Sequence, residues 1–228
     1  MIEIAGWKKN SFIDFPGTVS TVLFLSGCNL RCPYCHNPGI VCGEYEPIPF
    51  DEIRNYIYRR QGIIEGAVIS GGEPSMHSGL RWLCDELGIL GLEVKIDTNG
   101  LEPEAVIVCE FDYLALDIKT SFKKYARLGS PYHDNSERLG QSVDIVKAMG
   151  ERSEVKITAV PGIVDREDID NLCVELRGVN KVFIQQFEPN LPVLDLSYQS
   201  IKPYSADELE IWRGKFLDAG IECSIRGM

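Results

Sequence analysis

The chain has 228 residues, of which 44% are hydrophobic and 25% charged, values that are typical of a folded globular protein. Its formal net charge of −11 argues against nucleic acid as a partner, because binding to phosphate backbones needs clustered Lys and Arg. The chain has no apolar run of the roughly 20 residues that a membrane helix needs, and its start lacks the features of a secretory signal. We therefore expect a cytoplasmic protein with no membrane partner.

Short apolar runs alternate with longer amphipathic segments along the chain, which is the pattern of βα units and a parallel sheet. Six strands are predicted, over residues 19–25, 66–70, 92–96, 113–118, 155–160 and 181–185. Helices are predicted over residues 50–60, 80–90, 103–109, 136–149, 168–176 and 206–219, and a short last strand over 222–225. The fold expected from this order is α/β, an incomplete, laterally open (β/α)6 barrel. We expect one domain over residues 1–228, with a lead-in over 1–18, a core over 19–220 and a short C-terminal strand in 221–228.

Polar motifs follow the carboxyl ends of the predicted strands. In parallel α/β barrels the active site forms at that rim, because the loops after the strands converge there. An open barrel of six strands also suits a bulky substrate. The motifs lie at residues 26–38, 70–74, 97–100, 117–120, 160–162 and 185–188.

The first of these motifs contains Cys28, Cys32 and Cys35, with the spacing C-x3-C-x2-C. A [4Fe–4S] cluster normally takes four cysteine ligands, so three thiolates would leave one iron open to another molecule. A zinc site is the alternative, with His36 as a fourth ligand, but His36 directly follows Cys35 and no second pair of ligands is visible. Disulfides are not expected in a cytoplasmic protein. The remaining cysteines are dispersed singly and are interpreted as free thiols: Cys42, Cys84, Cys109, Cys173 and Cys223.

Two further motifs carry groups that suit a charged ligand. Gly71 and Gly72 would let the backbone approach a ligand closely, and Glu73 would offer an acceptor. Asp117 and Lys119 lie two residues apart on a strand, so their side chains share a face. They form either a structural ion pair or part of a mixed-charge cradle for a zwitterion.

The cysteine loop, with Tyr34 before its last cysteine, resembles the signature of radical S-adenosylmethionine (SAM) enzymes. The Gly-Gly-Glu-Pro turn one βα unit later is similar to the methionine-binding motif of that family. The ordered set of motifs over residues 12–190 resembles the activating enzymes of glycyl radical enzymes. The lead-in Phe-Ile-Asp-Phe-Pro-Gly at 12–17 is most similar to the anaerobic ribonucleoside-triphosphate reductase activating proteins.

The resemblance implies a [4Fe–4S] cluster on Cys28, Cys32 and Cys35, where SAM completes the open iron and is cleaved reductively. The resulting 5′-deoxyadenosyl radical would then take a hydrogen atom from a glycine of a partner enzyme. By similarity to the pyruvate formate-lyase activating enzyme, a monovalent cation would be held by Asp97, Thr98 and Asp117. The residues expected to contact SAM are Tyr34, His36, Gly71, Gly72, Glu73, Asp97, Asn99, Asp117, Lys119 and Gln185.

Two departures from the pyruvate formate-lyase activating enzyme argue against pyruvate formate-lyase as the partner. Phe15 stands where that enzyme has Gly, and Gln185 and Gln186 stand where it supplies a histidine to the ribose of SAM. Either glutamine is able to bond a hydroxyl group. The expected partners are anaerobic ribonucleotide reductase and a one-electron donor such as flavodoxin or ferredoxin. The alternatives are another glycyl radical enzyme, a radical SAM enzyme acting on a small molecule, and an iron–sulfur electron carrier.

Overall fold

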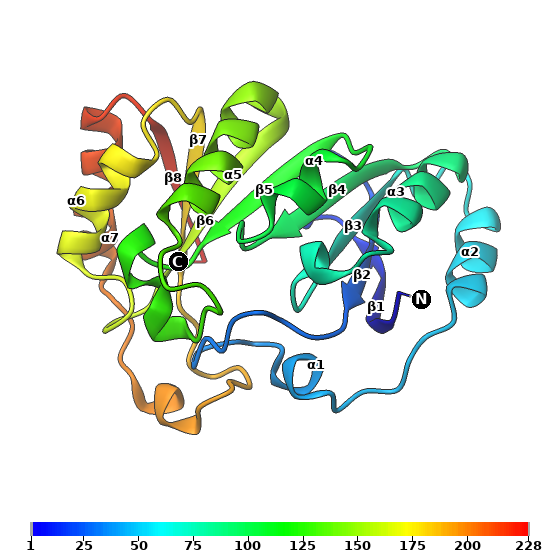
Figure 1. The fold of residues 1–228 in the computed structure, drawn as a ribbon, viewed down its shortest axis with the longest axis horizontal. Helices are drawn as coiled ribbons and strands as arrows, with labels where there is room; N and C mark the ends of the chain where they lie inside the picture. The colour runs from blue at the N-terminus through cyan, green and yellow to red at the C-terminus, as the bar shows by residue number, and fades with distance from the viewer. Residues whose placement is uncertain (1, 228) are drawn as a thin grey trace. The chain divides into compact units, whose positions relative to one another are not determined.

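The structure is a computed structural model that describes residues 2–227. The chain divides into two compact units, and the elements of both are labelled in Figure 1. Unit 1 contains the residues up to Asn29, Gly39–Thr98 and Glu104–Leu114. Unit 2 contains Leu30–Pro38, Asn99–Pro103 and the residues from Ala115 onward.

The strands form one open order, β1-β2-β3-β4-β5-β6-β7-β8, which does not return from β8 to β1. The pair β1 and β2 is antiparallel, whereas β2–β3, β3–β4, β6–β7 and β7–β8 are parallel. This topology confirms the prediction of an incomplete, laterally open α/β barrel. The strands are β1 (Ile4–Ser11), β2 (Ser20–Leu25), β3 (Gly66–Gly71), β4 (Glu93–Thr98), β5 (Tyr113–Ile118), β6 (Ser153–Ala159), β7 (Lys181–Gln186) and β8 (Glu222–Arg226).

Helices connect the parallel strands, as a βα pattern requires. They are α1 (Pro38–Cys42), α2 (Phe50–Tyr58), α3 (Leu80–Ile89), α4 (Pro103–Ile107), α5 (Ser136–Met149), α6 (Arg166–Glu175) and α7 (Ala206–Asp218). Short 3-10 helices cover Pro74–Met76, Phe122–Leu128, Gly150–Arg152 and Leu196–Ser200. In unit 2, α6 and α7 lie side by side, and α7 covers β7 and β8 (Figure 1).

Successive residues of β2, β3 and β5 are buried, so both faces of these strands are covered, which explains their apolar runs. In unit 1 the strands β2, β3 and β4 carry fully buried side chains such as Leu23, Ile69 and Ile96, and α3 packs on β4. In unit 2 Ile157, Ile184 and the helix residue Phe216 are likewise fully buried. The hydrophobic cores thus lie between the strands and their helices.

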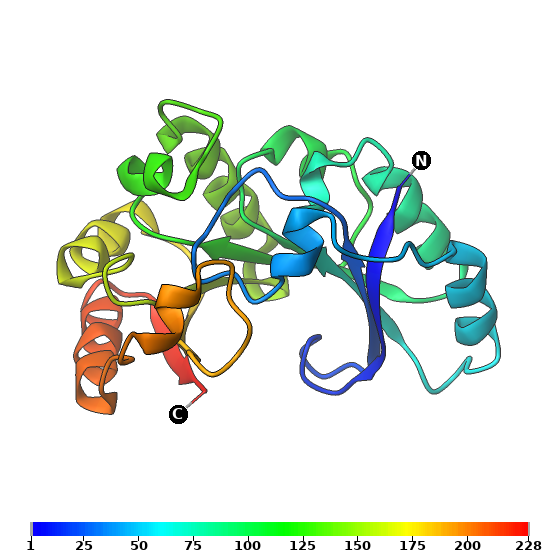
Figure 2. The same ribbon diagram turned by 90° about the horizontal axis from the view of Figure 1, so that it is seen from below.

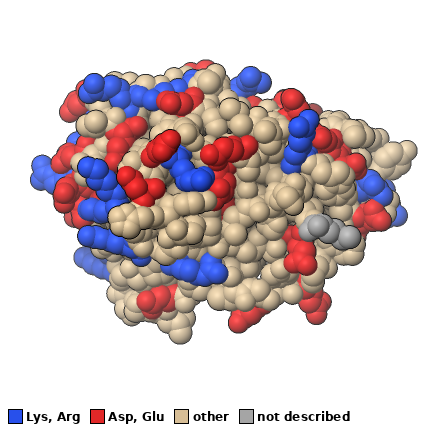
Figure 3. Space-filling model, viewed as in Figure 1, with Lys and Arg blue, Asp and Glu red and all other residues tan. Residues whose placement is uncertain are grey.

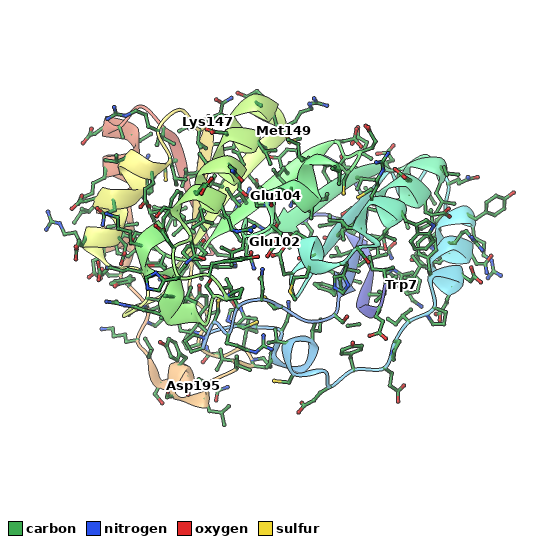
Figure 4. The ribbon with its side chains drawn as sticks, in the orientation of Figure 1. Trp7, Glu102, Glu104, Lys147, Met149 and Asp195 are labelled. Atoms are coloured by element: carbon green, nitrogen blue, oxygen red, sulfur yellow. The ribbon has the colours of Figure 1, made fainter. Side chains whose placement is uncertain are left out.

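All six predicted core strands are present within two residues of their expected ends, and so is the last strand. The sequence did not predict β1 or α1. In β1 only Ile4 and Ser11 are buried, so this edge strand lacks the apolar run that identifies its neighbours. Trp7, labelled in Figure 4, secures β1 by donating a hydrogen bond of 2.7 Å to the Thr21 hydroxyl and by edge contact with Tyr56. The loop that joins β1 to β2 extends beyond the strand ends (Figure 2).

The division into two units does not decide the prediction of a single domain, because β5 has residues in both units. That expectation stays a prediction. Its outer boundaries, Met1 in the lead-in and Met228 after the last strand, lie outside the described residues.

Candidate active site

Cys28 lies in unit 1, three residues after the end of β2. The backbone before it is held from two sides. The Gly27 N–H donates to the Ile40 carbonyl at 3.3 Å, and a ring nitrogen of His77 lies 2.7 Å from the Ser26 carbonyl oxygen. The sequence analysis did not assign a contact to His77. The contact shows that the 3-10 turn after Gly-Gly-Glu-Pro supports the cysteine loop.

The two glycines of the Gly-Gly-Glu-Pro turn are required by packing within the protein. Gly71 has a φ of +121°, and a Cβ atom added to Gly72 would lie 1.5 Å from the Gly27 carbonyl oxygen. The same carbonyl accepts a hydrogen bond of 2.9 Å from the Glu73 N–H, and the Leu25 carbonyl accepts one of 2.9 Å from the Gly72 N–H. The turn therefore lies directly against the beginning of the cysteine loop, and no side chain fits between them.

The Glu73 carboxylate organises this turn from inside, because only 1% of the residue is exposed. Its Oε1 atom accepts hydrogen bonds from the Ser75 N–H at 3.0 Å, the Ser75 hydroxyl at 2.6 Å and the Thr98 hydroxyl at 2.6 Å. The last bond joins the turn after β3 to the end of β4. Among the residues predicted from sequence, Glu73 and Thr98 are thus in direct contact.

Asp97, next to Thr98 on β4, has a lysine partner that the sequence analysis did not identify. The Lys95 ammonium lies 3.0 Å from the Asp97 carboxylate and donates a hydrogen bond of 2.6 Å to the Asp14 carbonyl oxygen. Lys95 is two residues before Asp97, so both side chains lie on the same face of the strand. This spacing of two residues is the feature of the sequence from which the Lys95–Asp97 pair could have been predicted.

Cys32 and Cys35 lie in unit 2, where they form a tight turn. The Cys35 N–H donates to the Cys32 carbonyl at 3.0 Å. Asp195, labelled in Figure 4, donates its backbone N–H to the Pro33 carbonyl at 2.8 Å, so the segment after β7 supports this turn. The Arg31 N–H donates to the Leu128 carbonyl at 2.7 Å. Arg31 and Pro33, which lie on either side of Cys32, are therefore each hydrogen-bonded to another segment of unit 2.

Two aromatic side chains of the loop are held by one phenylalanine. Tyr34 meets the ring of Phe187 edge-on, with centroids 6.4 Å apart, and His36 stacks on the same ring at 6.0 Å. Burial lowers the pKa of His36, which favours its neutral form, and burial together with the Cys32 thiol raises the pKa of Tyr34. Within residues 2–227 the His36 Nε2 atom is buried and has no hydrogen-bond partner. A buried nitrogen of this kind fits contact with a bound ligand.

Asp117 and Lys119 contact one another as the strand period predicts, with 3.8 Å between ammonium nitrogen and carboxylate oxygen. Lys156 of β6 approaches the same carboxylate to 3.5 Å, a contact that the sequence analysis missed. Burial alone would lower the pKa of Lys119, but the Asp117 carboxylate and the Cys32 thiol outweigh it and raise that pKa. Burial raises the pKa of the Cys32 thiol, and the nearby Lys119 ammonium opposes this shift. Lys119 is thus a fixed positive charge beside the Cys32–Cys35 turn.

The other residues of unit 2 that were predicted to contact SAM differ in their hydrogen bonds and in their exposure. Asn99 is buried, and its side-chain oxygen accepts a hydrogen bond of 3.1 Å from the Leu101 N–H. The Gln186 amide donates to the Tyr204 carbonyl at 2.6 Å. Gln185 is exposed, and it pairs in register with Thr158 of β6 and Arg226 of β8. Of the two glutamines, Gln185 therefore has the more accessible amide.

The five other cysteines are free thiols, as expected, but they are not all isolated. The thiols of Cys84 and Cys109 in unit 1 interact with one another, which raises the pKa of Cys84 and lowers that of Cys109. Cys42 at the end of α1 is exposed. Across the part of the chain that the structure describes, no group of three or more His, Cys, Asp or Glu side chains forms a metal-binding arrangement. The cluster prediction therefore depends on the cysteine spacing and on relatives of the chain.

Residues 22–191 match the model of the radical SAM superfamily. The chain belongs to the radical SAM superfamily. The match begins in β2 and ends after β7, so it includes the cysteine loop and every strand-end motif described above.

Relatives of this radical SAM protein carry two kinds of name. One, from Methanocaldococcus jannaschii and provisionally named a glycyl-radical enzyme activating enzyme, is 33% identical over 198 residues, which are 82% of this chain and 80% of that protein. The pyruvate formate-lyase-activating enzyme of Staphylococcus epidermidis is 36% identical over 220 residues, 87% of this chain and 85% of that protein. The 7-carboxy-7-deazaguanine synthase of Hyperthermus butylicus is 38% identical over 93 residues, which are 39% of this chain and 38% of that protein.

Solved structures confirm the fold. Streptococcus suis SuiB bound to the precursor peptide SuiA has a TM-score of 0.67 at 15% identity, with 90% of this chain and 48% of that one covered. QueE from Escherichia coli has a TM-score of 0.58 at 15% identity, and the match covers 100% of this chain and 94% of the QueE chain. The open barrel of the radical SAM type is therefore confirmed.

Membership of the superfamily implies a [4Fe–4S] cluster and SAM as cofactors. The residues fit such cofactors chemically. Cys32 and Cys35 offer thiolates from one tight turn, Lys119 offers a fixed positive charge, and the His36 Nε2 atom is a buried group that lacks a partner among residues 2–227. None of the described helices has the length and hydropathy that crossing a bilayer requires.

Proposed function

We propose that this radical SAM protein is an activating enzyme that generates a glycyl radical on a partner protein, most specifically on anaerobic ribonucleoside-triphosphate reductase. The observation that carries the proposal is the similarity to two relatives named as activating enzymes, which extends over more than 80% of this chain. The lead-in at residues 12–17 favours the reductase as the partner. The proposal includes a cytoplasmic location and a flavodoxin or ferredoxin as electron donor, and it involves no nucleic acid.

Each candidate residue has a role that its chemistry supports. When bound, the cluster and SAM supply a 5′-deoxyadenosyl radical that removes a hydrogen atom from a glycine α-carbon. Cys28, Cys32 and Cys35 would hold the cluster. Peptide carbonyls of the Gly71–Gly72 turn would accept hydrogen bonds from the SAM amino group, since the Glu73 carboxylate is bonded to Ser75 and Thr98.

Asp97 of unit 1 would also serve SAM binding, and the other SAM contacts belong to unit 2 in this proposal. Lys119 would face the SAM carboxylate, because it stays charged and lies on the same strand face as Asp117. Tyr34, His36 and Asn99 would meet the nucleoside, and Gln185 would bond a ribose hydroxyl. The monovalent cation expected at Asp97, Thr98 and Asp117 is not part of this proposal, because each aspartate has a lysine ammonium within 4 Å in its own unit.

The test is anaerobic incubation of the reconstituted protein with the candidate reductase, SAM and a one-electron reductant, followed by electron paramagnetic resonance. We expect the doublet of a glycyl radical on the reductase. The Cys32→Ala variant, which lacks one predicted cluster ligand, should give no doublet and no SAM cleavage. Wild-type activity of Cys32→Ala would contradict the cluster assignment.

A second candidate function is supported by the similarity to 7-carboxy-7-deazaguanine synthase. In that case the substrate would be a small molecule. The two functions are separated by the same experiment. A small-molecule enzyme would cleave SAM with its own substrate and leave every candidate partner protein without a radical.

A further inference from the structure

Lys95 is a buried cation in the middle of a largely buried strand. It lies between Val94 and Ile96 on β4, and only 3% of the residue is exposed. A lysine in such a position is costly to bury unless its charge is matched. Its ammonium lies 3.0 Å from an Asp97 carboxylate oxygen and 2.6 Å from the Asp14 carbonyl oxygen. The ring of Tyr113 lies 5.8 Å away, within the range of a cation–π contact.

These groups form the kind of environment that a monovalent cation takes. A carboxylate oxygen, a carbonyl oxygen and an aromatic face surround one positive charge. The carboxylate is that of Asp97, the residue at which the sequence predicts a monovalent metal ion. Because the ammonium already neutralises one negative charge at this carboxylate, a second monovalent cation gains little by binding there.

Asp117 of unit 2 shows the same feature independently. Its carboxylate lies 3.5 Å from the ammonium of Lys156 and 3.8 Å from that of Lys119. The side chain of Lys156 is 15% exposed. Both aspartates of the predicted cation site thus have lysine counter-charges that belong to the chain itself.

We propose that Lys95 is a fixed counter-cation of Asp97, which takes the place of an exchangeable monovalent metal ion. This inference rests on the proposed function only for the statement that Asp97 serves SAM binding. Lys95 is a positioning residue in this view, since it acts on SAM through Asp97.

Lys95 also joins the lead-in to this site within unit 1. The Asp14 carbonyl belongs to the loop between β1 and β2, and the Asp14 carboxylate is paired with Lys8 at 2.9 Å. The neighbouring Phe15 is buried and packs on Tyr113, with ring centroids 5.8 Å apart. Phe15 departs from the Gly of the pyruvate formate-lyase activating enzyme. The loop that carries this departure is therefore held by the same lysine that neutralises Asp97.

The first experiment measures ion binding by the full-length chain without SAM. Melting temperature is recorded in K⁺, Na⁺ or tetramethylammonium chloride at constant ionic strength. We expect the wild type to melt at the same temperature in all three salts. The Lys95→Met variant should be stabilised saturably by K⁺, because the vacated position then accepts an ion. Saturable stabilisation of the wild type by K⁺ or Na⁺, or an ion-insensitive Lys95→Met, would overturn the proposal.

A double variant keeps the test decisive if Lys95→Met does not fold. The double variant combines Lys95→Met with Asp97→Asn. It lacks the Asp97 carboxylate as well, so no counter-charge is needed. This variant should fold and should melt at the same temperature in all three salts. Failure of the double variant to fold would contradict the pairing as the reason for burying Lys95.

The second experiment measures SAM affinity of the reconstituted enzyme. The wild-type dissociation constant should not depend on K⁺, whereas Lys95→Met should bind SAM about tenfold more weakly without K⁺ and regain affinity when K⁺ is added. Wild-type affinity that requires K⁺ would overturn the inference. Because the melting experiment uses neither SAM nor a partner, its outcome is independent of whether the chain activates a glycyl radical enzyme.

Discussion

At the scale of single residues, the two glycines of the Gly-Gly-Glu-Pro turn are needed for packing within the protein. This role is separate from the ligand contact that the sequence predicts for them. They allow the turn to contact the backbone of the cysteine loop at Leu25 and Gly27. Their identity therefore follows from packing in unit 1, whichever ligand the loop holds. A substitution here should affect stability and activity together.

The Gly72→Ala variant tests this packing. Its Cβ atom would lie 1.5 Å from the Gly27 carbonyl oxygen, so the backbone must move. We expect a loss of about 3 kcal/mol in the free energy of unfolding, together with loss of SAM cleavage. Chemical denaturation and 5′-deoxyadenosine formation are the measurements. Gly88→Ala in α3 is the matched control, because no atom lies within 4 Å of its added Cβ. It should be neutral or stabilising by about 1 kcal/mol.

Lys119 provides the corresponding test of charge. Lys119→Met should weaken SAM binding about tenfold while iron content stays unchanged, because the charge near Cys32 is lost and no cluster ligand is removed. Isothermal titration under anaerobic conditions and iron analysis check both effects. Lys119→Arg should recover part of the affinity. Loss of iron in Lys119→Met would instead assign Lys119 a structural role.

The candidate residues show which contacts a sequence is able to predict. The Asp117–Lys119 pair was predictable because two residues of one strand share a face. The same spacing joins Lys95 and Asp97, but nothing in the sequence indicated that Lys95 is buried beside that carboxylate. Lys156 approaches Asp117 from another strand, and His77 reaches Ser26 across 51 positions of the chain. Such contacts depend on tertiary structure and could not be read from local patterns.

At the scale of elements, strands that are buried on both faces were predictable, and the edge strand β1 was not. The apolar runs of β2, β3 and β5 mark them directly, whereas β1 includes the polar residues Lys8, Lys9 and Asn10. The start of α6 was misplaced by two residues, because Asp165 and Asp168 form a capping box around its first turn. The sequence predicts Asp168 as the first residue of that helix, whereas it is the third.

Asp168 also anchors the segment after β5. Its buried carboxylate accepts from the Ser121 hydroxyl at 2.6 Å and pairs with the Lys124 ammonium at 2.8 Å. Burial alone would raise the pKa of Asp168, but these bonds outweigh it and lower that pKa. The carboxylate therefore stabilises the fold above its unfolded-state pKa of about 4, and this contribution is lost as the pH falls through the lower folded-state pKa.

The Lys124→Met variant should unfold about 3 kcal/mol more easily at neutral pH, because it leaves the Asp168 carboxylate buried without its cation. Denaturant titrations at neutral pH and in the acid range below pH 4 measure the effect. The difference from wild type should shrink in acid, where Asp168 becomes protonated. Lys123→Met, at the exposed neighbouring position, should change stability by less than about 0.5 kcal/mol. Equal effects of the two variants would contradict the buried ion pair.

At the scale of the whole molecule, the strand order was predictable from the regular alternation of strands and helices, because successive βα units place their strands side by side. The division into two compact units was not, since no linker or change of composition marks it. On the face drawn in Figure 3, acidic and basic side chains are interspersed over the region of α5, α6 and α7. The prediction that nucleic acid is not a partner rests on the net charge of −11 and stays a prediction.

The most direct test of the account follows a hydrogen atom from the partner to the nucleoside. The candidate reductase is prepared with deuterium on the α-carbon of every glycine and incubated anaerobically with this radical SAM protein, SAM and reductant. The account predicts 5′-deoxyadenosine that carries one deuterium atom, in an amount equal to the glycyl radical formed. Nucleoside without deuterium, formed at the same rate whether or not the reductase is present, would contradict it.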